Sequence, residues 1–165
     1  MIDVIIIGAG TAGLSAAIYV QRAGKKALVL EESTYGGQII NTVDIENYPG
    51  IKHISGFDFA TELFNQAKDL GTTFAFEGVV KIENRDDEKV VYTAKNEYHA
   101  KAIIIATGMK RRELGIDREK ELTGKGVSYC ATCDGMFFRG KDVAVNGGGN
   151  VAVEDVEYLT RYCNR

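Results

Sequence analysis

The chain has 165 residues, of which 45% are hydrophobic and 26% charged, with a net charge of -3. This length allows one globular domain and part of a second, and the balanced charge gives no electrostatic basis for binding nucleic acid or a membrane surface. Three cysteines are an odd number, which does not fit a secreted disulfide framework, and no basic stretch precedes the apolar N-terminus as in a signal peptide. We therefore expect a cytoplasmic protein.

The N-terminal segment has the pattern of a dinucleotide-binding unit. Residues 3–7 are a β-branched run typical of a strand buried in a parallel sheet, and residues 14–20 predict a helix that ends near Gly24. Between them lies the sequence G-x-G-x-x-G, made of Gly8, Ala9, Gly10, Thr11, Ala12 and Gly13. In this fingerprint the glycines permit a tight turn, the approach of a pyrophosphate and close packing of helix on strand.

A second buried strand is predicted at residues 27–30, with Glu31 at its end. The dinucleotide fingerprint requires an acidic side chain at this point, because it accepts hydrogen bonds from a ribose diol. The alternative is a glycine-tolerant turn followed by a surface glutamate. The polar segments 33–38 and 46–50 are plain loops by composition alone.

The next part of the chain predicts one more helix and the rest of the sheet. Residues 56–70 have the spacing of a core-facing amphipathic helix. Alternation over residues 73–100 predicts antiparallel strands with a charged turn at 85–89. Residues 102–106 predict a wholly buried strand, parallel to the first strand and leading to the ligand edge of the sheet.

Cys130 and Cys133 are separated by two residues, which favours dithiol–disulfide exchange because this spacing lowers the pKa of one thiol. Asp134 follows directly and can give a proton to a leaving thiolate. The rival interpretation is a zinc site that also uses Cys163. Zinc requires about four ligands, and neither Cys163 nor the two histidines have ligand spacing.

A second glycine-rich unit follows the two cysteines. Residues 142–146 predict a strand, 147–149 a turn, and 150–163 a helix that Asn150 can cap. The turn and helix contain G-x-G-x-x-A, a second dinucleotide fingerprint made of Gly147, Gly149 and Ala152. Two fingerprints on either side of one dithiol indicate an electron path from a nicotinamide through a flavin to a disulfide.

These motifs together resemble the low-molecular-weight, flavin-dependent thioredoxin reductases, and the resemblance covers the whole chain. Its strongest segments are residues 8–13, 36–38, 46–50, 106–108, 130–134 and 147–150. The FAD-binding residues that the resemblance implies are Gly8, Gly10, Thr11, Ala12, Gly13, Glu31, Gly37, Gln38, Asn47, Ala106, Thr107 and Gly108. The residues that it implies for NADPH are Gly147, Gly149, Asn150 and Ala152.

The resemblance also implies a mechanism. NADPH passes hydride to the flavin, the reduced flavin reduces the Cys130–Cys133 disulfide, and the resulting dithiol reduces a thioredoxin-like protein. Cys133 would lie beside the flavin, Cys130 would attack the partner's disulfide, and Asp134 would be the acid–base group. A homodimer is a further expectation from the family.

We therefore expect an α/β fold, with a Rossmann-like, doubly wound FAD-binding domain that includes a small antiparallel β section. The expected parts are residues 1–108 for this domain without its C-terminal completion, 109–125 for a linker, and 126–165 for the truncated start of an NADPH-binding domain. One strand and one helix do not complete a dinucleotide domain, so the NADPH site is expected to be incomplete. The alternatives are a non-catalytic FAD-binding fragment and a related flavin dithiol oxidoreductase with another donor or partner.

Overall fold

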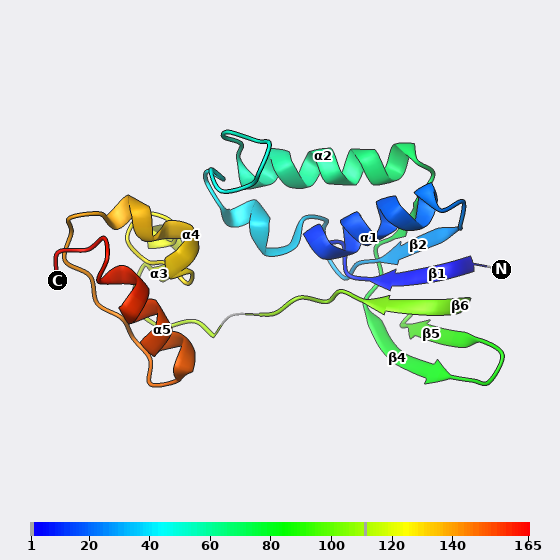
Figure 1. Ribbon diagram of the computed structural model, residues 1–165. Coiled ribbons are helices and arrows are strands. Elements are labelled where there is room, and N and C mark those ends of the chain that lie inside the picture. The colour runs from blue at the N-terminus through cyan, green and yellow to red at the C-terminus, as the bar shows by residue number, and fades with distance from the viewer. Residues whose placement is uncertain (1, 111) are drawn as a thin grey trace. The chain divides into compact units, whose positions relative to one another are not determined.

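The computed structural model describes residues 2–110 and 112–165. The chain forms two compact units, which divide between Met109 and Lys110 (Figure 1). Within the described ranges, no helix is both long enough and apolar enough to cross a membrane.

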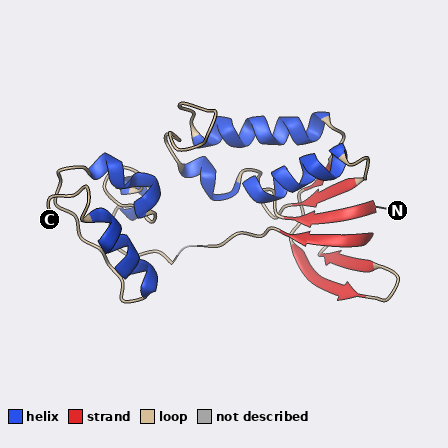
Figure 2. Ribbon diagram, viewed as in Figure 1, coloured by secondary structure: helices blue, strands red, loops and turns tan. Residues whose placement is uncertain are grey.

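The first unit is built on a mixed six-stranded sheet in the order β3-β2-β1-β6-β5-β4 (Figure 2). β1 pairs in parallel with β2 and with β6, β2 pairs in parallel with β3, and β4, β5 and β6 pair antiparallel. The strands are β1 Ile2–Ile7, β2 Ala27–Leu30, β3 Thr73–Ala75, β4 Val79–Asn84, β5 Lys89–Thr93 and β6 Glu97–Ile105. This arrangement confirms the expected mixed α/β fold.

Helices α1 (Thr11–Arg22) and α2 (Gly56–Asp69) lie on the same face of this sheet (Figure 1). The short 3-10 helix η1 (Gly37–Asn41) precedes α2 in the chain. Ser55 caps α2, since its hydroxyl accepts a hydrogen bond from the amide of Asp58 at 3.0 Å. The cap and the apolar spacing of the sequence together explain where this helix begins and which face it buries.

Side chains of β1 alternate between two apolar cores. Ile6 packs on the helix side, and Ile5 and Ile7 pack on the opposite side, because successive residues of a strand point to opposite faces. The core on the helix side consists of the buried residues Ile6, Ala9, Leu14, Ala17, Ile18, Ala27, Val29 and Ala67. The core on the other side consists of Ile5, Ile7, Leu28, Leu30, Val91 and Ala100. Because both faces of β1 are buried, the register of this strand in the sheet is fixed.

Two details of the predicted sheet are wrong. Residues 73–75 form β3, which runs parallel to β2 and not antiparallel. Residues 102–105 do form a strand parallel to β1, but it is not wholly buried, since Ile104 is 36% exposed and Ile105 is 68% exposed. The reason is that α1 packs mainly over β1 and β2, and α2 packs on α1 and η1, so the end of β6 lacks a covering layer among the described residues.

The second unit is helical. It contains α3 (Glu119–Leu122), α4 (Ala131–Asp134), the 3-10 helix η2 (Gly135–Phe138) and α5 (Asn150–Leu159). None of the residues of α5 is buried.

The predicted strand at residues 142–146 is not formed. A strand requires a neighbouring strand, and residues 141–143 instead make two backbone hydrogen bonds with residues 164 and 165. The amide of Val143 donates to the carbonyl of Arg165 at 2.8 Å, and the amide of Asn164 donates to the carbonyl of Lys141 at 2.9 Å. The predicted capping role of Asn150 is also wrong. Gly149 is the N-cap of α5, Asn150 is its first helical residue, and the helix ends at Leu159.

Candidate functional site

The turn after β1 requires glycine at two positions. Gly8 has a φ of 105°, and a Cβ atom added there would lie 2.4 Å from the carbonyl oxygen of Ala106. A Cβ atom on Gly13 would lie 1.9 Å from the carbonyl oxygen of Gly8. The first glycine therefore allows the turn to pass close to β6, and the last allows α1 to pack against the turn.

The middle of the fingerprint presents open backbone. Gly10 is the N-cap of α1, and Thr11 and Ala12 are the first residues of that helix. A Cβ atom on Gly10 would meet only the Cα of Gly37, at 3.9 Å, so a ligand has room to approach the backbone here. The first amides of a helix have no intrahelical acceptor, and they attract anionic groups such as a pyrophosphate.

Glu31 points from the end of β2 toward this turn. Its Oε2 atom accepts a hydrogen bond from the amide of Ala9 at 2.8 Å, and its Oε1 atom accepts one from the amide of Ser33 at 3.1 Å. The two backbone amides fix the carboxylate in place. Each carboxylate oxygen retains further acceptor capacity, which suits the hydroxyl groups of a ribose.

A cavity of about 250 Å³ opens at the carboxyl ends of β1, β2 and β6. It is lined by Ile7, Gly8, Leu30, Glu31, Glu32, Glu77, Val79, Ile82, Ile105 and Thr107. Ligands of open α/β sheets bind at this edge, where the strand order reverses between β1 and its two neighbours. Three carboxylates in the lining favour a neutral, hydroxyl-rich group over a phosphate.

The remaining first-unit residues that the sequence singled out lie outside the lining of this cavity. Gly37 reaches the fingerprint, since a Cβ atom there would lie 3.2 Å from the Cα of Gly10. Gln38 follows in η1, and Asn47 is exposed in the loop before α2. Ala106 packs against the core on the helix side, and Gly108 has a φ of 66°. The structure thus brings Gly8, Glu31 and Thr107 together at one cavity.

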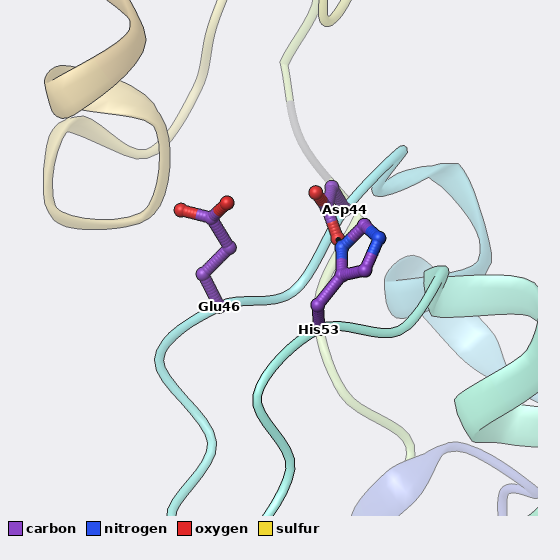
Figure 3. A group of neighbouring side chains, drawn as sticks. All are labelled: Asp44, Glu46 and His53. Carbon is purple, nitrogen blue, oxygen red and sulfur yellow. Dashed lines mark hydrogen bonds and ion pairs between the residues drawn. The ribbon is translucent and has the colours of Figure 1, made fainter.

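Asp44, Glu46 and His53 form a cluster that the spacing of the sequence did not indicate (Figure 3). Their possible ligand atoms lie within 4.8 Å of one another, because an isolated bridge pairs Ile45 with Ile54. His53 already accepts or donates a 2.6 Å hydrogen bond at Nδ1 with Asp44, and its side chain is 71% exposed. We interpret Asp44 and His53 as a hydrogen-bonded pair that holds the loop before α2.

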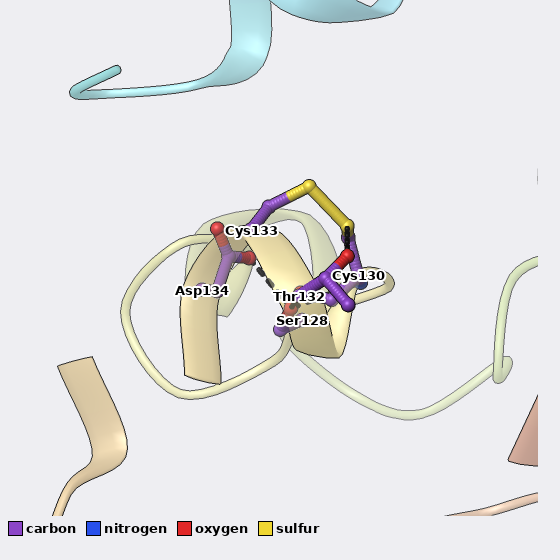
Figure 4. The surroundings of a disulfide bond; sticks show 5 residues. All are labelled: Ser128, Cys130, Thr132, Cys133 and Asp134. Atoms are coloured by element: carbon purple, nitrogen blue, oxygen red, sulfur yellow. Dashed lines mark hydrogen bonds between the residues drawn. A yellow bond between two sulfur atoms is a disulfide. The ribbon is translucent and has the colours of Figure 1, made fainter. Parts of the chain in front are cut away.

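The second unit holds Cys130 and Cys133 in a disulfide, with their Cα atoms 5.3 Å apart (Figure 4). Cys130 is the N-cap of α4, and its carbonyl accepts hydrogen bonds from the amides of Cys133 at 3.2 Å and Asp134 at 3.0 Å. Cys133 is exposed and Cys130 is half-buried. The helical turn therefore brings the two sulfur atoms together and leaves one side of the disulfide open to reaction.

Asp134 has a partner that the motif did not reveal. The hydroxyl of Ser128 donates a hydrogen bond to Oδ2 of Asp134 at 2.5 Å, and it accepts one from the amide of Cys130 at 3.1 Å (Figure 4). Sequence reasoning did not single out Ser128. The local signal that could have found it is a serine two residues before Cys130, since a serine hydroxyl often accepts a hydrogen bond from the amide two residues later.

Cys163 is separate from the dithiol. Its thiol donates a long hydrogen bond, 3.6 Å, to the carbonyl of Phe138. Cys130 and Cys133 are bonded to each other, so the described residues offer no zinc site built from the three cysteines.

The second fingerprint forms its turn and helix but not its strand. Gly147 approaches Ala152, since a Cβ atom added to Gly147 would lie 2.9 Å from that of Ala152. The amide of Ala152 donates to the carbonyl of Gly149 at 3.1 Å, which starts α5. Without the preceding strand, Gly149 and Asn150 stand at the start of α5 but not at the end of a strand of the described residues 142–146.

The mixed α/β fold, the glycine turn and the dithiol are the features expected of a disulfide oxidoreductase, and the comparisons agree. The chain belongs to the pyridine nucleotide-disulphide oxidoreductase family, whose model matches residues 2–165. More particularly, it matches an N-terminal portion of thioredoxin reductases. It is 47% identical over 163 residues to a thioredoxin reductase of Bacillus subtilis, a match that covers 99% of this chain and 52% of that protein.

Two further relatives show the same coverage. The crystal structure of thioredoxin reductase from Streptococcus pyogenes is 46% identical, with a TM-score of 0.96, and the match covers 100% of this chain and 54% of that one. A protein of Clostridium pasteurianum described as a 34.2 kDa protein in a rubredoxin operon is 48% identical over 162 residues, 98% of this chain and 53% of that protein. The chain spans about half the length of the curated relatives that it matches.

Proposed function

We propose that the chain is the FAD-binding and dithiol-bearing part of a thioredoxin-disulfide reductase. The observation that carries this proposal is the pairing, in one chain, of an open G-x-G-x-x-G turn beside Glu31 with a C-x-x-C disulfide followed by Asp134. The proposed parts are a FAD-binding domain over residues 1–108, a linker over 109–125, and the start of an NADPH-binding domain over 126–165. We place the protein in the cytoplasm, in a homodimer.

FAD fits the residues of the first unit. Glu31 would hold the ribose of the adenosine half, since its carboxylate lines the cavity and is fixed by two amides. The open backbone at residues 10–12 would hold the pyrophosphate. Gly37, Gln38 and Asn47 would lie along the flavin, and residues 106–108 would also contact FAD. When bound, FAD supplies two-electron transfer between a nicotinamide and a disulfide.

NADPH fits less completely. Gly147, Gly149, Asn150 and Ala152 would provide the turn and helix start that face a pyrophosphate. The strand that normally precedes such a turn is not formed, so the described residues do not make a closed nucleotide pocket. The proposal of NADPH as donor is supported by the family and not by this geometry.

The dithiol exchanges electrons in two steps. The Cys130 thiolate attacks one sulfur of the partner's disulfide and forms a mixed disulfide, while the other partner sulfur leaves with the bonding electron pair and takes a proton. The Cys133 thiolate then attacks Cys130 Sγ, which restores the Cys130–Cys133 bond and releases the partner as a dithiol. Asp134 would donate and receive the protons.

The first test of this function is the visible absorption spectrum of the chain with added FAD. The chain is then titrated anaerobically with dithionite, and a fresh sample is titrated with NADPH. We expect bound flavin that dithionite bleaches, and a chain that takes up two further electrons for the disulfide. Bleaching by NADPH would show that a working donor site is assembled. A chain that binds no FAD under any of these conditions would contradict the proposal.

A second candidate function is a flavin dithiol oxidoreductase with another donor or partner. The incomplete second fingerprint supports this candidate: the strand before it is not formed, so the described residues do not specify the donor. Reduction of a thioredoxin by the dithionite-reduced chain distinguishes the two. A reduced chain that leaves thioredoxin oxidised but reduces other protein disulfides would support the second candidate.

A further inference from the structure

We propose that Ser128 is a positioning residue for the dithiol, because its hydroxyl can hold the Asp134 carboxyl in both of the protonation states that disulfide exchange requires. The inference rests on the proposed function, in which Asp134 is the acid–base group. It adds a residue outside the C-x-x-C-D motif and gives that residue a specific task.

The Ser128 hydroxyl lies within hydrogen-bond distance of three polar atoms. Oγ of Ser128 lies 2.5 Å from Oδ2 of Asp134, 3.1 Å from the amide nitrogen of Cys130 and 3.3 Å from the carbonyl oxygen of Cys130 (Figure 4). Both Ser128 and Asp134 are half-buried. The hydroxyl therefore links the carboxyl group to the backbone of one of the two cysteines.

A serine hydroxyl has one hydrogen to donate and two lone pairs that accept. When Asp134 is ionised, Ser128 donates to the carboxylate and accepts from the Cys130 amide. The 2.5 Å distance is in the range of hydrogen bonds from a hydroxyl to an ionised oxygen.

When Asp134 is protonated, the same contact can reverse its direction. The carboxyl group then donates to Oγ, which uses its second lone pair, and the Cys130 amide keeps the first. The hydroxyl hydrogen turns toward the Cys130 carbonyl, which it shares with the amides of Cys133 and Asp134. The carboxyl group keeps its position in both states, and no polar atom of the trio loses its partner.

Exchange passes through both of these states. When an external dithiol reduces the chain, its thiolate attacks one sulfur of the Cys130–Cys133 bond. That bond breaks, and the departing sulfur takes the electron pair and a proton from Asp134. The second external thiol resolves the mixed disulfide, so the protein gains two electrons and two protons and the external dithiol becomes a cyclic disulfide. Asp134 regains its proton from water.

A purely structural role for Ser128 is the competing explanation, because the Cys130 amide bond alone could shape the turn. The two explanations differ in how the effects of substituting Ser128 and Asp134 on the reduction rate combine. A positioning residue acts through Asp134, so its loss has little further effect once Asp134 is asparagine. A structural residue has the same effect in either background.

The test measures the rate of disulfide reduction by dithiothreitol in the intact chain. Samples are quenched with acid and alkylated, and the mass then shows one label for the oxidised chain and three for the reduced chain. Cys163 supplies the constant label and the internal reference. The variants are Ser128→Ala, Ser128→Thr, Ser128→Val, Asp134→Asn and the Ser128→Ala/Asp134→Asn pair. Threonine and valine side chains have nearly the same shape, and valine has a methyl group where threonine has the hydroxyl. Comparing these two variants therefore isolates the effect of the hydroxyl.

We expect Ser128→Ala and Ser128→Val to slow reduction about tenfold, less than the full effect of an acid–base group. Ser128→Thr should stay within about threefold of the wild type, and Ser128→Ala should add less than about twofold to Asp134→Asn. Thermal unfolding followed by circular dichroism identifies any variant that fails to fold, and the Thr and Val pair then decides the result.

Equal rates for Ser128→Thr and Ser128→Val would overturn the inference, as would a tenfold effect of Ser128→Ala in the Asp134→Asn background. In either case a slow Asp134→Asn variant would leave the proposed acid–base role intact. If Asp134→Asn reduces at the wild-type rate, the acid–base role of Asp134 and the inference both fail. FAD binding, measured separately, then decides whether the proposed flavoprotein function survives.

Discussion

Glu31 accepts a hydrogen bond from the backbone amide of Ala9 at 2.8 Å, which joins the end of β2 to the turn after β1. The carboxylate is therefore held at the cavity before any ligand arrives. Its second oxygen accepts from the amide of Ser33, so two backbone amides preorganise the carboxylate of the proposed ribose site.

The first prediction concerns this contact. Glu31→Gln should weaken FAD binding about tenfold to a hundredfold, because a hydrogen bond to a charged group contributes about 1.5–3 kcal/mol. Quenching of FAD fluorescence gives the dissociation constant. Glu32→Gln is the matched control, since Glu32 lines the same cavity from the next position. Equal weakening by both changes would mean that the cavity responds to charge in general and not to the Glu31 contact.

The second prediction concerns the packing of α1 on the glycine turn. Gly13→Ala should destabilise the first unit by about 3 kcal/mol, because its Cβ atom would lie 1.9 Å from the Gly8 carbonyl oxygen and the backbone must shift. Urea unfolding followed by circular dichroism measures the change. Gly126→Ala is the control, since nothing lies within 4 Å of the Cβ position there. A Gly13→Ala chain as stable as the control would show that helix and turn separate at little cost.

The third prediction concerns Asp3, which joins β1 to β6 and to the residue before β2. Lys101 donates to its Oδ1 atom at 2.7 Å, and the amide of Lys26 donates to Oδ2 at 2.9 Å. The hydrogen bond from Lys101, followed by the one from the Lys26 amide, lowers the pKa of Asp3 from 3.8 to about 2. The stabilisation from Asp3 is therefore fully present above pH 3.8 and is lost as the pH falls toward 2.

Asp3→Asn should accordingly lower the urea midpoint at pH 7. The difference in urea midpoint between Asp3→Asn and the wild type should shrink as the pH falls from 4 to 2. The effect is small because the partner Lys101 is largely exposed, and solvent screens ion pairs at the surface. Glu83 also has its pKa lowered to about 2, first by Lys81, so the wild-type chain keeps part of its acid dependence in this variant. Asp87→Asn, in the exposed turn between β4 and β5, is the control. A constant gap between Asp3→Asn and wild type at all pH values would contradict the prediction.

Apolar runs in the sequence predicted strands correctly only where a neighbouring strand exists. Residues 27–30 form β2 because β1 and β3 lie on either side, whereas residues 142–146 have a similar pattern and form no strand. The pairing partner is a non-local property that periodicity does not contain. The cover over a strand is also non-local. Ile105 pairs with Ile7, but its apolar side chain is exposed because no described element covers it.

The site shows the same division between local and non-local information. The motif located the glycine turn, Glu31 and the C-x-x-C pair, because each depends on spacing along the chain. It gave no indication of Ser128, since the importance of that hydroxyl depends on a 2.5 Å contact with Asp134 across a turn. It also did not indicate the Asp44 and His53 pair, which an isolated strand bridge brings together.

The last prediction assigns the two sulfur atoms. In the proposed mechanism Cys130 attacks the partner. A Cys133→Ser chain should therefore form a stable mixed disulfide with a thioredoxin-like protein whose cysteine is held in a mixed disulfide with a small aromatic thiol, because that thiol leaves as a thiolate when Cys130 attacks. Cys130→Ser should form this adduct at least tenfold more slowly. Cys163→Ser should leave the yield unchanged, because Cys163 is separate from the disulfide and its thiol donates to the Phe138 carbonyl. Mass spectrometry of the adducts measures each rate. Cys133 is the more exposed residue, so solvent access alone favours the opposite order, and faster adduct formation through Cys133 would reverse the proposed roles.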